Sequence, residues 1–220
     1  MRLYGYWRSS AAYRVRIALN VKGLEAEHRV VNLEGPQGAN RQPPYLALNP
    51  AGKLPTLEID GQVLVQSLAI LDYLEETRPE PPLLPREPAD RAAVRAFCLT
   101  LAADVHPIQN SRVLSYLRDK AGFDEVAVEA WASEWMTAAF TALEETLDRR
   151  GWGGPHAFGP DVTLADLCLV PQMYNARRFN VDLSPFPRLV AIDAAACALP
   201  AFARAAPEAQ PDYPAPGDPA

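Results

Sequence analysis

The sequence predicts two domains, a small α/β domain followed by an all-helical domain, and three observations support this fold class. Up to about residue 78, short apolar runs typical of strands alternate with stretches of helical periodicity. From residue 89 onward, only the helical periodicity remains. Between these regions, residues 79–88 are interrupted by repeated prolines, which exclude a continuous helix and a central strand. We therefore expect a stiff linker over residues 79–88.

The first domain begins with a strand, a helix and a second strand. Residues 3–7 form a short run rich in aromatic side chains, which is typical of a strand. Ser9 or Ser10 can cap a helix that ends at Gly23, because serine favours the start of a helix and glycine its end. Residues 28–33 then predict the second strand.

A hairpin and another helix complete this domain. Residues 54–59 and 63–65 flank Asp60-Gly61, which is a strong signal for a two-residue turn. Ser67 begins a helix with leucines at helical spacing. The order β-α-β followed by β-β-α is typical of a thioredoxin-like sheet. We therefore predict a thioredoxin-like domain over residues 1–78.

The second domain is predicted to be all-helical and to span residues 89–206. Pro107 predicts a kink, and Thr163 with Asp166 has the spacing of a capping box. Prolines recur after residue 207, so we expect a loosely ordered tail over residues 207–220. The helical stretches are residues 89–119, 125–150, 164–178 and 188–206.

The composition narrows the possible partners and location. The 220 residues carry a net charge of -6, which argues against nucleic acid as a partner. No stretch approaches the roughly 18 apolar residues of a membrane span, and residues 1–6 lack the apolar run of a signal peptide. Cys98, Cys168 and Cys197 are widely spaced, so we expect reduced core cysteines, no metal site and a cytoplasmic protein.

Residues 8–10, with the sequence Arg-Ser-Ser, lie at the turn from the first strand to the first helix. A helix N-terminus presents unpaired N–H groups and partial positive charge, which stabilise a thiolate. A serine hydroxyl there can add a hydrogen bond to the sulfur. The alternative interpretation is that Ser9 and Ser10 are helix caps only.

Two further motifs suit an extended peptide. A cis bond between Leu54 and Pro55 would leave the backbone of Leu54 able to pair with such a peptide. Gln66 and Ser67 precede a helix, whose N-terminus fits a carboxylate. Together with residues 8–10, these motifs predict a site for a tripeptide with a thiol at one end and a γ-glutamyl carboxylate at the other.

The chain resembles the zeta class of glutathione transferases, which includes maleylacetoacetate isomerases and bacterial maleylpyruvate isomerases. The resemblance runs from residue 1 to about residue 206 and implies a thioredoxin-like N-terminal domain, an all-helical C-terminal domain, a homodimer and glutathione as cofactor. Its most specific segments are residues 8–10, 14–19, 47–50, 66–70, 106–110, 170–172 and 176–183.

The resemblance also implies roles for individual residues. Ser9 matches the residue that supports the glutathione thiolate, with Ser10 and Arg8 beside it. This chain has Ala11 where many members of the class have cysteine, which puts in doubt side reactions that use a protein thiol. The positions expected to contact glutathione are Lys53, Leu54, Pro55, Gln66 and Ser67, together with the polar residues Gln109 and Asn110.

Arginines are the expected anchors for a dicarboxylate substrate, because a guanidinium grips a carboxylate with two parallel hydrogen bonds. Candidates are Arg8, Arg112, Arg177 and Arg178, of which Arg8 and Arg178 are favoured. The alternative is that they are surface residues paired with acids. We interpret Arg14 and Arg16 as structural residues of the first helix, and His106 also as structural.

The resemblance implies glutathione-dependent cis–trans isomerisation of maleylacetoacetate to fumarylacetoacetate, as in tyrosine and aromatic amino-acid breakdown. The thiolate would add to the double bond and leave after rotation. Three alternatives stay open: a maleylpyruvate isomerase of gentisate breakdown, a transferase acting on small α-haloacids, and a non-catalytic glutathione-binding module.

Overall fold

The computed structural model describes residues 1–33 and 38–215, which form two compact units. The first unit comprises Met1–Pro82 together with the C-terminal segment from Leu199, and the second comprises Leu83–Ala198. The boundary lies inside the segment predicted as a linker. Leu83 is buried in the second unit, where its carbonyl accepts a hydrogen bond from the N–H of Leu164 at 2.9 Å.

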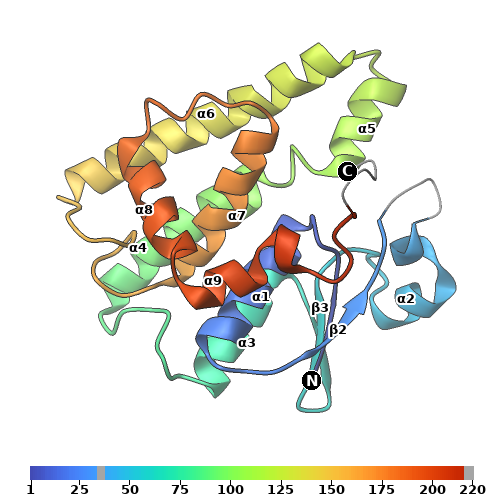
Figure 1. Cartoon of the computed structure of the whole chain (residues 1–220), viewed down its shortest axis with the longest axis horizontal. Helices are drawn as coiled ribbons and strands as arrows, with labels where there is room; N and C mark the ends of the chain where they lie inside the picture. Colours follow the sequence, from blue (N-terminus) through green and yellow to red (C-terminus); the bar gives the residue numbers. More distant parts are fainter. Residues whose placement is uncertain (34–37, 216–220) are drawn as a thin grey trace. The chain divides into compact units, whose positions relative to one another are not determined.

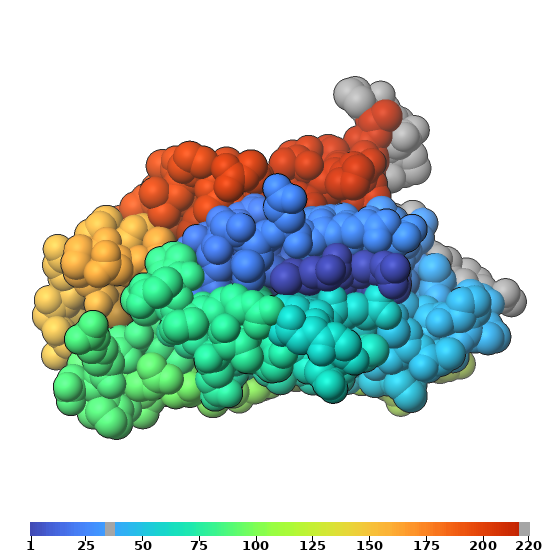
Figure 2. Space-filling view, turned by 90° about the horizontal axis from the view of Figure 1, so that it is seen from below, coloured from blue at the N-terminus to red at the C-terminus, as the bar shows by residue number. Residues whose placement is uncertain are grey.

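The first unit is built on a four-stranded mixed sheet with the order β2-β1-β3-β4 (Figure 1). Strand β1 pairs in parallel with β2 and antiparallel with β3, which in turn pairs antiparallel with β4. In Figure 2 the first residues of the chain, in dark blue, lie between the blue segment that follows them and the cyan hairpin. The predicted thioredoxin-like arrangement is confirmed. The strands are β1 (Arg2–Gly5), β2 (Glu27–Val30), β3 (Thr56–Ile59) and β4 (Gln62–Val65).

The predicted hairpin turn is also confirmed. Asp60 and Gly61 both have positive φ values, 52° and 75°, as the mirror-image two-residue turn requires. Ile59 pairs with Gln62 directly across this turn. The turn therefore fixes the register of β3, the strand that continues from Pro55.

Helices α1 (Ser10–Val21) and α3 (Ser67–Thr77) pack against each other in the first unit and bury their apolar faces. Two short elements were not predicted: η1 (Ala39–Arg41), a 3₁₀ turn, and α2 (Pro43–Leu48). Helix α2 spans six residues, too few to show a helical period, and begins with Pro43, which is tolerated at the first helical turn.

The expected boundary at residue 206 and the loose tail differ from the structure. Pro200 starts a separate helix, α9 (Pro200–Ala205), which lies beside α1 in the first unit (Figure 1). After it comes the 3₁₀ turn η3 (Pro207–Ala209), and Gln210 is buried. Its Nε2 donates to the carbonyls of Arg204 and Ala206, so residues 207–210 are packed rather than loose. Residues 216–220 of the predicted tail lie outside the described residues.

The second unit is helical, as predicted, and its segments are more divided than the sequence indicates. The expected helix over residues 89–119 consists of α4, a π-helical stretch and α5, with the break around Pro107. The capping box of Thr163 and Asp166 is present. None of the described helices is long and apolar enough to cross a membrane. The elements are α4 (Pro88–Leu99), η2 (Thr100–Val105), α5 (Ser111–Asp119), α6 (Glu125–Arg149), α7 (Leu164–Arg178) and α8 (Pro187–Cys197).

Candidate functional site

The turn between β1 and α1 places Ser9 at the cap of the helix. Its N–H bonds to the carbonyl of Tyr6 at 3.0 Å, and its Oγ accepts the N–H of Ala12 at 3.2 Å. Because the oxygen is the acceptor in this cap, the hydroxyl hydrogen of Ser9 remains available to donate elsewhere. Ser9 is partly exposed and Ser10 is buried, so Ser9 is the better placed of the two to meet a ligand. Capping and thiolate binding are thus compatible roles for one side chain.

Arg8 is held over an aromatic ring in the same turn. Its guanidinium carbon lies 5.3 Å from the centre of the Trp7 ring, and Trp7 itself is buried. A cation over an indole face is stabilised by the negative charge of the ring face. The stack directs the guanidinium without using its N–H groups, which stay suited to an anion.

A buried network holds the segment of Lys53, Leu54 and Pro55. The hydroxyl of Tyr45 donates to the carbonyl of Lys53 at 2.6 Å, and Asn49 Nδ2 donates to the same oxygen at 2.7 Å. Burial raises the pKa of the Tyr45 hydroxyl, which therefore stays protonated as a donor. The peptide bond between Leu54 and Pro55 is cis. Tyr45 was not predicted as a site residue, because its bond to a backbone carbonyl leaves no local motif in the sequence.

Ser67 begins α3 and lies against a buried arginine. Nη1 of Arg14 donates to Oγ of Ser67 at 3.3 Å, and both side chains are buried. The hydroxyl of Ser67 is thereby left to donate to a second partner. The helix start and the guanidinium both favour an anion at this point. Arg14, which the sequence indicated as structural only, therefore joins the candidate site.

Gln66 adds a second sign of function at the start of α3. Its φ is 69°, although it is not a glycine. Non-glycine residues in this region are held there by their surroundings and gather at ligand-binding positions. The side chain of Gln66 is exposed beside Ser67, where the sequence placed a ligand carboxylate.

In the second unit, Gln109 is buried at 4% exposure, and within the described chain neither its Oε1 nor its Nε2 has a hydrogen-bond partner. A buried amide without partners costs about 1–3 kcal/mol for each unmet group, so its environment calls for a polar ligand or water. Asn110 caps α5 by accepting the N–H of Arg112 at 3.3 Å, and the side chain of Arg112 is exposed. Gln172, on α7, also has a buried amide whose oxygen and nitrogen lack hydrogen-bond partners within the described chain, and no separate role was predicted for it.

The paired arginines at the end of α7 have different surroundings. Arg177 bonds to Asp193, a carboxylate that is almost fully buried. Burial raises the pKa of the Asp193 carboxyl, and the bond from Arg177 opposes that shift. Arg178 is exposed, with its guanidinium 5.0 Å from the Phe179 ring. Both side chains are exposed, and Arg177 is the one bonded to a buried carboxylate.

The cysteines contribute no further site in the described parts of the chain. None of the three forms a disulfide, and Cys98 and Cys168 are buried. Cys197 is exposed at the end of α8, so the expectation of three core cysteines is wrong for it. Across residues 1–33 and 38–215, no group of three His, Cys, Asp or Glu side chains could hold a metal ion.

The chain is similar to known proteins over most of its length. The family model for the glutathione S-transferase N-terminal domain matches residues 3–82. A probable maleylacetoacetate isomerase of Vibrio cholerae is 50% identical over 211 residues, covering 96% of this chain and 97% of its own.

Two solved structures extend the likeness to three dimensions. The holo structure of a maleylpyruvate isomerase, a bacterial zeta-class glutathione S-transferase, is 46% identical, with a TM-score of 0.94 and coverage of 97% of this chain and 100% of its own. The maleylacetoacetate isomerase of Anaeromyxobacter dehalogenans, with dicarboxyethyl glutathione and citrate bound in the active site, is 43% identical. Its TM-score is 0.84, and the match covers 97% of both chains.

Proposed function

Because the chain belongs to the zeta-class glutathione transferases, the family of the maleylacetoacetate and maleylpyruvate isomerases, we propose that it is a glutathione-dependent cis–trans isomerase. Its substrate is an unsaturated dicarboxylic keto acid, with maleylacetoacetate as the leading candidate. The reaction converts this acid to fumarylacetoacetate.

One observation carries the proposal. Two serines, Ser9 and Ser67, stand at two helix starts of the same unit, each with an oxygen that already accepts a bond and a hydroxyl hydrogen left to donate. One suits a thiolate, and the other, backed by Arg14, suits a carboxylate. Glutathione carries both groups on one extended tripeptide. The fixed segment of residues 53–55 offers backbone groups for its middle.

The residues of this chain would stabilise the charged groups of the reaction and hold them in position. When bound, glutathione supplies the thiolate that adds reversibly to the double bond and so permits rotation. Ser9 and the start of α1 favour ionised sulfur, because both interact better with the anion than with the thiol. Arg8 would hold positive charge near the carbonyl oxygen on which negative charge develops.

Arg178 and Arg112 are proposed to bind the substrate carboxylates, since both are exposed guanidinium groups on the helical unit. Arg177 is proposed to fix the end of α7 through Asp193. The unmet amide of Gln109 would serve as a polar contact for the bound molecules. Gentisate breakdown remains the second candidate pathway, favoured by the similarity to the maleylpyruvate isomerase.

The test is an ultraviolet assay of maleylacetoacetate and maleylpyruvate, each with and without glutathione. We expect glutathione-dependent loss of the cis acid, and the preferred tail length identifies the pathway. Ser9→Ala should lower kcat/KM about a hundredfold, as loss of one donor to a reacting anion does. Ser184→Ala, at an exposed serine of the second unit, is the matched control.

Turnover without glutathione would refute the proposed mechanism. Glutathione binding with no turnover of either acid would favour the transferase or the binding module, which a panel of α-haloacids separates. We also propose a cytoplasmic homodimer. Light scattering that gave a monomer mass would refute the dimer, and fractionation of cells expressing the chain tests the location.

A further inference from the structure

Asp212 and Tyr213, in the C-terminal segment of the first unit, contact the turn that carries Ser9. Oδ2 of Asp212 accepts the backbone N–H of Trp7 at 2.9 Å, although the two residues are 205 positions apart. The ring of Tyr213 meets the Trp7 ring edge-on, with centroids 4.9 Å apart and planes at 79°. Trp7 is therefore held through its backbone and its side chain by two consecutive residues of the C-terminal segment.

Arg16, on α1, links the same turn to the C-terminal segment. Its buried guanidinium donates to the carbonyls of Tyr6 at 3.3 Å, Trp7 at 3.1 Å and Ala205 at 2.9 Å. Burial lowers the pKa of Arg16 to about 10, which leaves the group charged at neutral pH. Charged donors make the stronger class of hydrogen bond. The carbonyls of Tyr6 and Trp7 and the N–H of Trp7 are thus all fixed from outside the turn.

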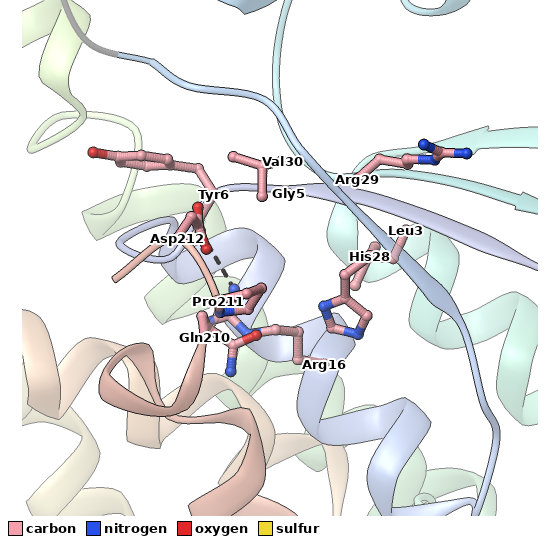
Figure 3. Close-up of a pocket in the computed structure, with 10 residues that line it drawn as sticks. All are labelled: Leu3, Gly5, Tyr6, Arg16, His28, Arg29, Val30, Gln210, Pro211 and Asp212. Carbon is pink, nitrogen blue, oxygen red and sulfur yellow. Dashed lines mark hydrogen bonds between the residues drawn. The ribbon is translucent and has the colours of Figure 1, made fainter. Parts of the chain in front are cut away.

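The space around these contacts is too small for a ligand. A cavity lined by Tyr6, Arg16 and Asp212, among others, has a volume of about 10 Å³, roughly the room for one water. Figure 3 shows residues of β1 and β2 on one side and Gln210, Pro211 and Asp212 on the other, with Arg16 between them. The charged and polar groups gathered here therefore serve the packing of the segment against the turn.

The fixed turn leads directly to the candidate site. The carbonyl of Tyr6 that Arg16 holds also accepts the N–H of Ser9, and the Trp7 ring that Tyr213 holds supports the guanidinium of Arg8. A reacting group must be held within about half an ångström of its productive position, and such precision comes from the residues behind it. Displacing Trp7 would shift both Arg8 and Ser9.

We propose that residues 210–213 form a clasp that positions Ser9 and Arg8 for thiolate binding, with Asp212 as its main positioning residue. The role rests on the proposed function of Ser9. The clasp touches neither the sulfur nor the substrate; it acts through Trp7 and the backbone of the turn.

The test compares Asp212→Ala, Asp212→Asn and Tyr213→Ala with Glu208→Gln, which changes an exposed acid of the same segment. Hydrogen exchange at residues 7–12 is measured without glutathione. The ultraviolet absorbance of the thiolate then gives the pKa of bound glutathione, and kcat/KM follows for each variant. A chain ending at Pro211 removes both residues that contact Trp7.

We expect Asp212→Ala to raise exchange at Trp7 and to lower kcat/KM, each roughly tenfold, and to raise the thiol pKa. Asp212→Asn, which keeps an acceptor oxygen, should recover part of each loss, and Glu208→Gln should change none of the readouts. Exchange and thiol pKa that stayed unchanged in Asp212→Ala would overturn the clasp. A wild-type chain that binds no glutathione would instead refute the proposed function, and the exchange data would still report on the contact.

Discussion

Replacing Arg14 tests how the first unit recognises a carboxylate. Arg14 is 1% exposed and donates to the hydroxyl of Ser67 at 3.3 Å. A carboxylate bonded to that hydroxyl would lie about 6 Å from the guanidinium, the sum of two hydrogen-bond lengths. At an effective dielectric constant of about 20, two unit charges at this distance attract by roughly 3 kcal/mol, and less where water enters.

The predicted consequence is a loss of glutathione affinity. Arg14→Met keeps much of the side-chain volume and removes the charge, so we expect glutathione to bind about 10–100-fold more weakly, equivalent to roughly 1–3 kcal/mol. Arg14→Lys keeps a charge in a different shape and should lose less. Calorimetric titration with glutathione measures each value, and Arg2→Met provides a control at an exposed arginine of the same unit.

The carboxylate itself can be removed from the ligand. Cysteinylglycine lacks the γ-glutamyl carboxylate, so its affinity should be the same for wild type and Arg14→Met. The double variant Arg14→Met/Ser67→Ala should lose less glutathione affinity than the sum of the losses in the two single variants, because both substitutions act on one contact. Equal glutathione affinity in folded Arg14→Met and wild type would refute the reasoning, as would fully additive losses.

Three further predictions concern the remaining polar groups. Arg178→Ala should raise KM for the substrate roughly 10–100-fold, whereas Arg177→Ala should chiefly lower stability, since it leaves the buried Asp193 without its cation; steady-state kinetics and urea unfolding separate the two. Asp166→Ala should lower the free energy of unfolding, measured with urea, by about 3 kcal/mol. The Asp166 carboxylate accepts hydrogen bonds from the N–H groups of Ala157 and Thr163 and from the hydroxyl of Thr163. Lys22→Met should lower the free energy of unfolding by about 3–5 kcal/mol, because it leaves the buried Glu75 without its cation. The Lys22 ammonium also donates to the carbonyls of Arg78 and Pro81. A stability equal to wild type would show that the pair contributes nothing.

Local sequence signals predicted the parts of the fold that local chemistry determines. The Asp60-Gly61 turn and the Thr163–Asp166 box both depend on residues within four positions of each other, and both are present. Ser9 and Ser67 could be found in the same way, since a serine before an amphipathic run marks a helix start. The roles of these two serines in binding remain predictions.

The predicted segment boundaries were wrong where tertiary packing, rather than local sequence, determines which unit a segment joins. Helix α9 continues the helical pattern of α8 in the sequence, yet Phe202 and Ala205 are buried in the first unit. The prolines after residue 207 indicated disorder, whereas Pro207 and Gln210 are buried. Proline prevents regular hydrogen bonding, but it does not prevent packing, so its frequency alone cannot separate a loose tail from a docked one.

The residues that hold the candidate site in place bond to backbone groups, which explains why they could not be predicted from the sequence. Tyr45 bonds to the carbonyl of Lys53, and Arg16 bonds to the carbonyls of Tyr6, Trp7 and Ala205. A backbone carbonyl is present at every position, so such a contact leaves no paired motif in the sequence. Asp212 likewise bonds to a backbone N–H. The groups that would meet the ligand can therefore be found from motifs, whereas the groups that hold them in place require the fold, and substitutions at the second set should alter function without changing any recognisable motif.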